Sequence, residues 1–114
     1  MELSGAIREA KKGTAELVVL ALLDEESRHG YELSRLIDER SDGALTFNFA
    51  SLYATLYRLE ERKWIQGRWV EKPGQRRRRY YTITPRGRDV LRVQRREWQR
   101  FFGVIRDLAG VRYA

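Results

Sequence analysis

Four consecutive arginines, Arg76–Arg79, followed by two tyrosines, form the densest group of side chains able to bind another molecule. Guanidinium groups bind phosphate oxygens through paired N–H donors, so this run favours a polyanionic partner. In a strand, side chains alternate between faces, which would place Arg77 and Arg79 on one face and Arg76 and Arg78 on the other. Such a hairpin can follow a phosphate backbone or insert an arginine into a minor groove. A charged edge that only blocks aggregation is the alternative.

A second candidate surface is the helix that Asn48 can cap and that Glu60–Lys63 completes. Leu52, Leu56 and Leu59 recur at helical spacing and mark its inner face. The opposite face is small at its start and polar or cationic further along, as a helix entering a major groove needs. An ordinary solvent-exposed face is the alternative. The residues expected to contact DNA on this helix are Asn48, Ser51, Tyr53, Ala54, Tyr57 and Arg58.

The last predicted helix carries a group of aromatic residues. It begins after Thr84 as N-cap and Pro85, and it extends to about Ala109, where Gly110 can end it. Its apolar residues alternate by three and four, the spacing of a helix that pairs with another helix. The residues expected to form a dimer interface are Leu91, Trp98, Phe101, Ile105 and Leu108.

That interface could also hold a ligand. A twofold axis near Trp98 would bring two indoles together, and they could clamp a flat apolar molecule. An apolar stripe at the N-terminus is expected to pack on the partner's last helix. A packed dimer core without a pocket is the alternative. The expected lining residues are Trp98, Phe101, Phe102, Leu3 and Ile7.

The elements that position these surfaces follow from periodicity. Leu3, Ala6, Ile7 and Ala10 predict a short helix that Gly13 ends. Thr14 is then expected to cap a second, buried helix with the apolar run 17–23. Residues 24–29 are expected to connect it to a third helix that ends near Arg40, with a turn at 41–43. Segments 65–70 and 79–83 predict a two-stranded hairpin around a turn at 72–74.

This order of helix, helix, helix, hairpin and long helix predicts a mainly α (α+β) fold, the winged helix-turn-helix. We expect residues 1–88 to form a DNA-binding domain that includes the N-terminal helix, and residues 89–114 to form a dimerisation helix.

Composition narrows the class of function. The 114 residues carry a net charge of +7, and the charge is uneven, because the first 57 residues sum to −4 and the last 57 to +11. A strongly basic half favours a nucleic acid partner. The chain has no cysteine and one histidine, so thiol chemistry and a multi-histidine metal site are excluded. The single His29 is expected to be a structural or capping residue. We expect no metal, no cofactor, no membrane segment and a cytoplasmic location.

Several ordered motifs resemble the PadR family of bacterial transcriptional regulators. Residues 29–33 match its HGYE-type motif, residues 51–60 its SLYxxLxRLE recognition helix, and residues 74–88 its wing and the entry to its last helix. Lys63 departs from the pattern, because the family commonly has glycine there, and Ala50 and Ala54 replace its usual glycine and proline. The length resembles the compact subfamily with a single C-terminal dimerisation helix. In some compact members a tryptophan on that helix stacks aromatic compounds, and Trp98 falls at the matching place.

The resemblance implies a homodimeric transcription factor, a repressor that binds double-stranded DNA at an inverted repeat, with an aromatic small molecule as a candidate effector. The alternative is a winged-helix module that binds proteins and not DNA, in which case the wing charge would be incidental. Salt-sensitive binding to duplex DNA separates the two. No nucleophile–base pair or glycine-rich phosphate loop supports an enzyme.

Overall fold

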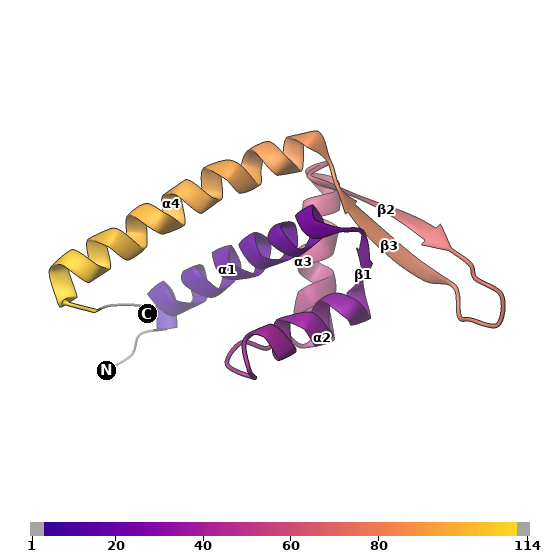
Figure 1. Cartoon of the computed structure of the whole chain (residues 1–114), viewed down its shortest axis with the longest axis horizontal. Coiled ribbons are helices and arrows are strands. Elements are labelled where there is room, and N and C mark those ends of the chain that lie inside the picture. The colour runs from indigo at the N-terminus through magenta and orange to yellow at the C-terminus, as the bar shows by residue number, and fades with distance from the viewer. Residues whose placement is uncertain (1–3, 112–114) are drawn as a thin grey trace.

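The computed structural model describes residues 4–111, and for residues 4–12 it describes the backbone alone. The expected contacts of Leu3 and of the Ile7 side chain lie outside this part of the chain. Helices α1 and α4 lie side by side, and the β2–β3 hairpin projects beyond the body of the molecule (Figure 1). The elements are α1 (Ser4–Glu25), β1 (Arg28–His29), α2 (Gly30–Arg40), α3 (Phe49–Glu61), β2 (Ile65–Val70), β3 (Arg78–Ile83) and α4 (Pro85–Ala109).

Helix α1 is continuous, so the predicted break at Gly13 is wrong. Thr14 therefore lies inside the helix and does not cap it. Glycine destabilises a helix interior by about 1 kcal/mol relative to alanine. Packing along a neighbouring helix contributes more stability than this. Gly13 lies against the Trp98 indole of α4, since a Cβ there would be 3.7 Å from its Cζ2 atom. Tertiary packing on α4 thus outweighs the local helix-breaking preference.

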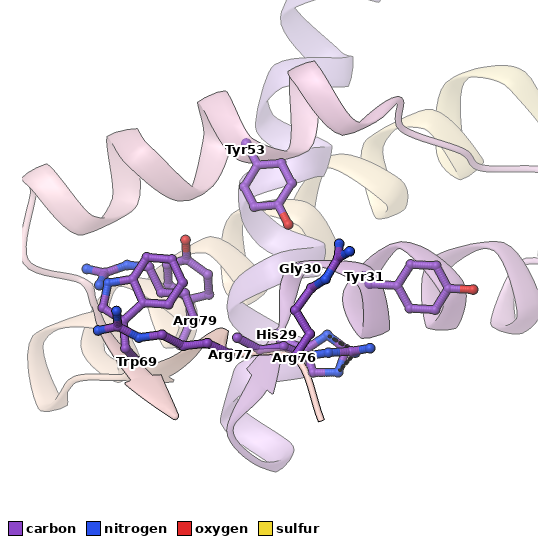
Figure 2. A pocket seen from close by; sticks show the side chains of 10 residues that line it. His29, Gly30, Tyr31, Tyr53, Trp69, Arg76, Arg77 and Arg79 are labelled. Carbon is purple, nitrogen blue, oxygen red and sulfur yellow. Dashed lines mark hydrogen bonds between the residues drawn. The ribbon is translucent and has the colours of Figure 1, made fainter. Parts of the chain in front are cut away.

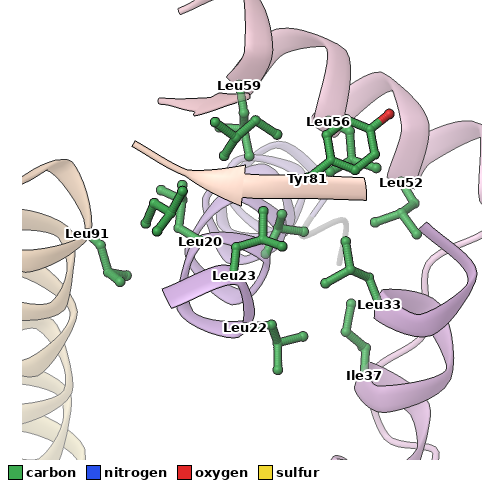
Figure 3. Close-up of a cluster of buried hydrophobic side chains, with 13 residues drawn as sticks. Leu20, Leu22, Leu23, Leu33, Ile37, Leu52, Leu56, Leu59, Tyr81 and Leu91 are labelled. Carbon is green, nitrogen blue, oxygen red and sulfur yellow. The ribbon is translucent and has the colours of Figure 1, made fainter. Parts of the chain in front are cut away.

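The core forms where the apolar faces of α1, α2 and α3 meet the base of the sheet (Figure 3). The predicted inner face of α3 is confirmed, because Leu52, Leu56 and Leu59 are all buried. The run 17–23 is buried on one side and half-buried on the other. The largest fully buried side chains are Leu20, Leu23, Leu33, Leu52, Leu56, Leu59, Ile65, Leu91 and Val19.

Leu91 corrects the predicted dimer interface. It was expected on an exposed face of the last helix, but it is 1% exposed and belongs to the core of its own chain. The first turns of α4 pack on α1, so an apolar residue there already has an intrachain partner. The exposed apolar residues of α4 begin further along the helix.

The sheet has three antiparallel strands in the order β1-β3-β2. The predicted hairpin is confirmed, with Ile65 opposite Ile83 and Val70 opposite Arg78. The third strand is a difference from expectation, because β1 lies in the segment 24–29 that was expected only to connect two helices. Its pairing with β3 is two residues long, which is too short to leave a periodic pattern in the sequence.

A tight junction joins α3, the hairpin and α4. Lys63 adopts a left-handed backbone conformation with φ of 62°, which costs a non-glycine residue roughly 1–2 kcal/mol. This is the position where the resemblance led us to expect glycine. Thr84 caps α4 by accepting a hydrogen bond from the Gly87 N–H at 3.1 Å, as predicted. A Cβ at Gly87 would clash with the Trp64 carbonyl oxygen, so only glycine fits there.

Helix α4 ends as predicted, because Gly110 adopts a left-handed conformation and its N–H donates to the Arg106 carbonyl. None of the helices within residues 4–111 is long and apolar enough to cross a membrane.

Candidate nucleic-acid interface

The outward face of α3 is exposed, as the helical spacing predicted. Tyr57 is 65% exposed and Tyr53 is 47% exposed, and Ser51 and Ala54 are also exposed. Asn48 caps the helix, because its side chain accepts a hydrogen bond from the Ser51 N–H at 2.8 Å. The helix therefore presents the small residues Ser51 and Ala54 beside exposed aromatic rings in its first turns, and the Tyr57 hydroxyl about two turns along.

Arg58 is held within the protein more than the sequence suggested. It donates a hydrogen bond to Thr55 Oγ1 at 3.2 Å and lies 4.0 Å from a carboxylate oxygen of Glu16 on α1. Arg62 pairs with the same carboxylate at 3.2 Å. Of the two predicted DNA contacts further along α3, Tyr57 is the one whose side chain is freer to reach outward.

Trp69 on β2 organises two of the four wing arginines. The guanidinium carbons of Arg77 and Arg79 lie 4.8 Å and 5.7 Å from the centre of its rings. The expectation that these two arginines share a face is therefore confirmed. Arg79 also forms an ion pair with Glu60 of α3, and its guanidinium crosses over Gly67, where a Cβ would clash with it. Arg79 thus ties the wing to α3.

Arg78 points instead toward His29 at the start of α2. Its Nη1 atom lies 2.8 Å from Nε2 of His29. The imidazole caps α2, because Nδ1 accepts a hydrogen bond from the Glu32 N–H at 3.2 Å, which confirms the capping role predicted for this residue. Burial, and then the charge of Arg78, lowers the pKa of His29 below its ordinary value. The ring is therefore neutral at pH 7.

The wing and the two helices enclose a cavity of about 530 Å³. His29 and Tyr31 line it from the start of α2, Tyr53 from α3, and Trp69 from β2 (Figure 2). All four wing arginines line it as well, so aromatic rings and positive charge meet at one place. A second cavity of about 550 Å³ lies between α3 and Arg79 and reaches Tyr57.

An exposed row of aromatic rings beside α3 was missed in the sequence. Tyr31 and Phe49 stack with centroids 6.5 Å apart, and Phe49 and Tyr53 lie 6.4 Å apart. All three are about half exposed. They come from α2 and from the first turns of α3, and a sequence pattern within either helix cannot show that they meet. Trp69 was missed for a similar reason, because its role depends on its cross-strand partner Arg79.

The far half of α4 carries a second exposed apolar surface. Trp98 lies 6.0 Å from Phe101 and 5.6 Å from Phe102, centre to centre. Phe101 is 53% exposed and Leu108 is 81% exposed, and Ile105 lies between them. Of the predicted dimer interface beyond Leu91, Phe101, Ile105 and Leu108 are exposed in a single chain, and Trp98 is half-buried beside Gly13 of α1.

A winged helix with an exposed helix α3 beside an arginine-rich wing is typical of DNA-binding regulators. Residues 19–93 match the Transcriptional regulator PadR-like family, and the chain belongs to this family. It is therefore a transcriptional regulator, and the members of the family are not enzymes.

The comparisons extend over most of the chain. A transcriptional regulator from Clostridium thermocellum has 30% sequence identity and a TM-score of 0.81, with 96% of this chain and 99% of that chain covered. A Lysinibacillus sphaericus protein described as uncharacterized protein X is 32% identical over 87 residues, which are 76% of this chain and 80% of that protein. Bacillus subtilis PadR in complex with operator DNA is similar in fold, with 21% identity, a TM-score of 0.62, and 68% of this chain and 44% of that chain covered.

Proposed function

We propose that the protein is a homodimeric repressor that binds an inverted-repeat operator in duplex DNA. The recognition helix α3 enters the major groove, and the wing arginines contact the backbone or the adjacent minor groove. The observation that carries this proposal is the exposed outward face of α3 beside the arginine wing, with both surfaces lining the same cavities. The operator complex of Bacillus subtilis PadR, a protein of similar fold, supports it.

The proposed assembly divides the chain as its sequence suggested. Residues 1–88 supply the DNA-binding domain and residues 89–114 the dimerisation helix, which would pair through Trp98, Phe101, Ile105 and Leu108. Repression is proposed on the family resemblance, since a dimer that occupies promoter DNA blocks access to it. An alternative function as a protein-interaction module predicts no sequence preference in DNA and no dependence on a repeat.

The test is selection of bound sequences from a pool of randomised duplex DNA. We expect an inverted repeat whose half-sites are centred about one helical turn apart, roughly 34–36 Å. Affinity for that repeat should fall steeply and linearly on a plot of log K against log salt concentration. Recovery of no common sequence, with weak binding that salt abolishes equally for every duplex, would favour the interaction module.

Tyr57→Phe should change which bases are preferred. The tyrosine hydroxyl is the polar group that the exposed centre of α3 offers to a base edge, and losing one base contact costs about 1–3 kcal/mol. We therefore expect a 5- to 150-fold loss of affinity for the selected operator and little change for unrelated DNA. Competition titrations with single base-pair variants of the operator would locate the affected position.

Arg76→Ala is the matched control for Tyr57→Phe, because a phosphate contact carries no sequence information. It should weaken all duplexes by a similar factor and leave the ranking of base variants intact. If Tyr57→Phe also weakened all duplexes equally, Tyr57 would contact the backbone and not a base.

We further propose that the dimer interface takes a flat aromatic effector between the two Trp98 rings. In a dimer with a twofold axis near this residue, Phe101 and Phe102 would complete an apolar wall, with Leu3 and Ile7 of the partner beside it. A ligand there would separate the two α4 helices, which begin directly after β3 of the wing, and so alter the spacing of the recognition helices. It must bind the DNA-free geometry more tightly to release the operator.

Titration of planar aromatic dyes should quench tryptophan fluorescence in the native protein and lose most of that quenching in Trp98→Ala. Trp69→Phe is the control, since it removes the exposed tryptophan of the wing and leaves α4 intact. The same dyes should lower operator affinity of the native protein. Quenching that survives Trp98→Ala, or dye binding without an effect on the operator, would contradict an effector site at Trp98.

A further inference from the structure

The contact between His29 and Arg78 places two hydrogen-bond donors against each other. His29 caps α2 through Nδ1, which accepts from the Glu32 N–H and must therefore keep its lone pair free. A neutral imidazole with a free Nδ1 carries its proton on Nε2. Yet Nε2 is the atom that lies 2.8 Å from Nη1 of Arg78, and a guanidinium has no acceptor.

No tautomer of the ring removes this conflict. If Nε2 accepted from Arg78, the ring proton would lie on Nδ1. The Nδ1–H group would then face the Glu32 N–H, and the cap of α2 would be lost. A charged imidazolium would add repulsion from Arg78 to that loss. The charged groups around the ring are Glu32 and Arg35 of α2, Lys72 of the β2–β3 loop, and Arg78. Positive charge prevails among them, so the two facing donors favour an anionic acceptor.

Arg78 is also placed differently from its neighbours in the wing. Arg79 pairs with Glu60, and Arg77 lies 3.8 Å from a carboxylate oxygen of Glu71. Among the side chains that the structure describes, no carboxylate forms an ion pair with Arg78. Its side chain is exposed and lines the 530 Å³ cavity together with His29, beside the face of α3 that we propose to enter DNA.

We infer that His29 and Arg78 clamp one non-bridging oxygen of a backbone phosphodiester of the bound DNA. The inference rests on the proposed function and names a phosphate contact within it. The phosphate oxygen accepts from Nε2–H of His29 and from Nη1–H of Arg78, while Nδ1 continues to cap α2. Two donors that share one acceptor stand about 4–5 Å apart, so the exposed Arg78 side chain moves outward by about 2 Å to admit the oxygen.

If His29 and Arg78 hold the same phosphate oxygen, substituting either residue should remove the same part of the operator affinity. His29→Asn keeps a good N-cap for α2 but is too short to reach the oxygen, and Arg78→Ala removes the other donor. Each should weaken operator binding about tenfold, and the double variant should also be about tenfold weaker, since either loss dismantles the same contact. The salt slope should fall by about one for each variant, because either substitution removes the same phosphate contact.

Methylphosphonate substitution, made one phosphate at a time along the selected operator, locates the contact. At one position in each half-site the neutral linkage should weaken the native protein about tenfold and have no effect on either variant. Titration of inorganic phosphate into the free protein, followed through the imidazole NMR signals of the sole histidine, provides a second measurement. These signals should shift in the native protein and in Arg77→Ala, but not in Arg78→Ala.

The outcomes separate this inference from the proposed function. Absence of sequence-specific DNA binding in the native protein would overturn both. If both variants bound the operator with native affinity, the clamp alone would be overturned. Losses that add in the double variant would overturn it as well. If inorganic phosphate still shifted the histidine signals in that case, the site would hold a free phosphate and not the DNA backbone.

Discussion

Replacing Arg76 and Arg77 together with alanine is expected to weaken operator binding roughly fiftyfold at 0.1 M salt. Each phosphate contact contributes about 0.9 to the slope of log K against log salt, or about eightfold in affinity between 1 M and 0.1 M salt. The slope should therefore fall by about two units, for specific and unrelated duplexes alike. Fluorescence anisotropy of labelled duplexes over a range of salt concentrations measures both quantities.

Removing Arg76 and Arg77 should disturb the rest of the protein less than removing Arg78 and Arg79. Arg79 holds Glu60 of α3, so its loss would also loosen the wing, and Arg78 lies against His29. Replacing all of Arg76–Arg79 should weaken binding further, with part of that effect arising from a displaced hairpin.

Arg96 and Arg100 provide a control with the same change in charge. Both are exposed on α4, and they lie about 160° around the helix from Trp98. Arg96→Ala with Arg100→Ala should change affinity by no more than a few-fold. If the wing variant kept native affinity and salt slope, these arginines would not contact DNA. If the control lost as much affinity, the arginines would act only through net charge.

Much of the fold follows from local patterns. The caps at Asn48 and Thr84, the inner face of α3 and the alternation of the hairpin are set by neighbouring residues, and each was predictable. The errors arise where distant segments meet. Gly13 remains helical because α1 packs on α4, and Leu91 is buried because α1 covers it. Periodicity indicates that a residue has an apolar neighbour, but it does not say which chain provides it.

In the candidate site, too, features set by nearby residues were predictable, and contacts between distant segments were not. The exposed face of α3 followed from spacing within one helix, and the shared face of Arg77 and Arg79 from their spacing in the sequence, although β3 begins only at Arg78. The aromatic row, the Glu60–Arg79 pair and the contact of His29 with Arg78 each join two elements. Their partners are 18 to 49 residues apart in sequence, beyond the reach of any helical or strand period.

Ile105→Asp is expected to dissociate the proposed dimer. Ile105 lies at the centre of the exposed apolar face, one turn from Phe101, Phe102 and Leu108. A twofold interface would contain this residue twice, and burying each isoleucine contributes about 1.5–3 kcal/mol. The dissociation constant of the dimer should therefore rise by about 10² to 10⁴, and more if the aspartates are buried. Sedimentation equilibrium at micromolar concentration would measure it.

The neighbouring Val104 offers a matched control, because it is 45% exposed and points about 100° away around the helix. Val104→Asp introduces the same charge and should leave the dimer intact. Circular dichroism of both variants would establish that α4 stays helical. A native protein that sediments as a monomer, or an Ile105→Asp protein that remains a dimer, would remove α4 as the dimerisation helix.

Loss of the dimer should also remove the advantage of a two-site operator. In the dimer, binding of one recognition helix holds the second near its half-site, so the full repeat gains affinity without any new contact. Native protein should thus bind the full operator far more tightly than a single half-site. Ile105→Asp should bind both duplexes alike, at the affinity of the native protein for the half-site, since α3 and the wing are unchanged. If it still preferred the full operator as strongly as the native protein does, the two half-sites would be joined through a surface other than the apolar face of α4.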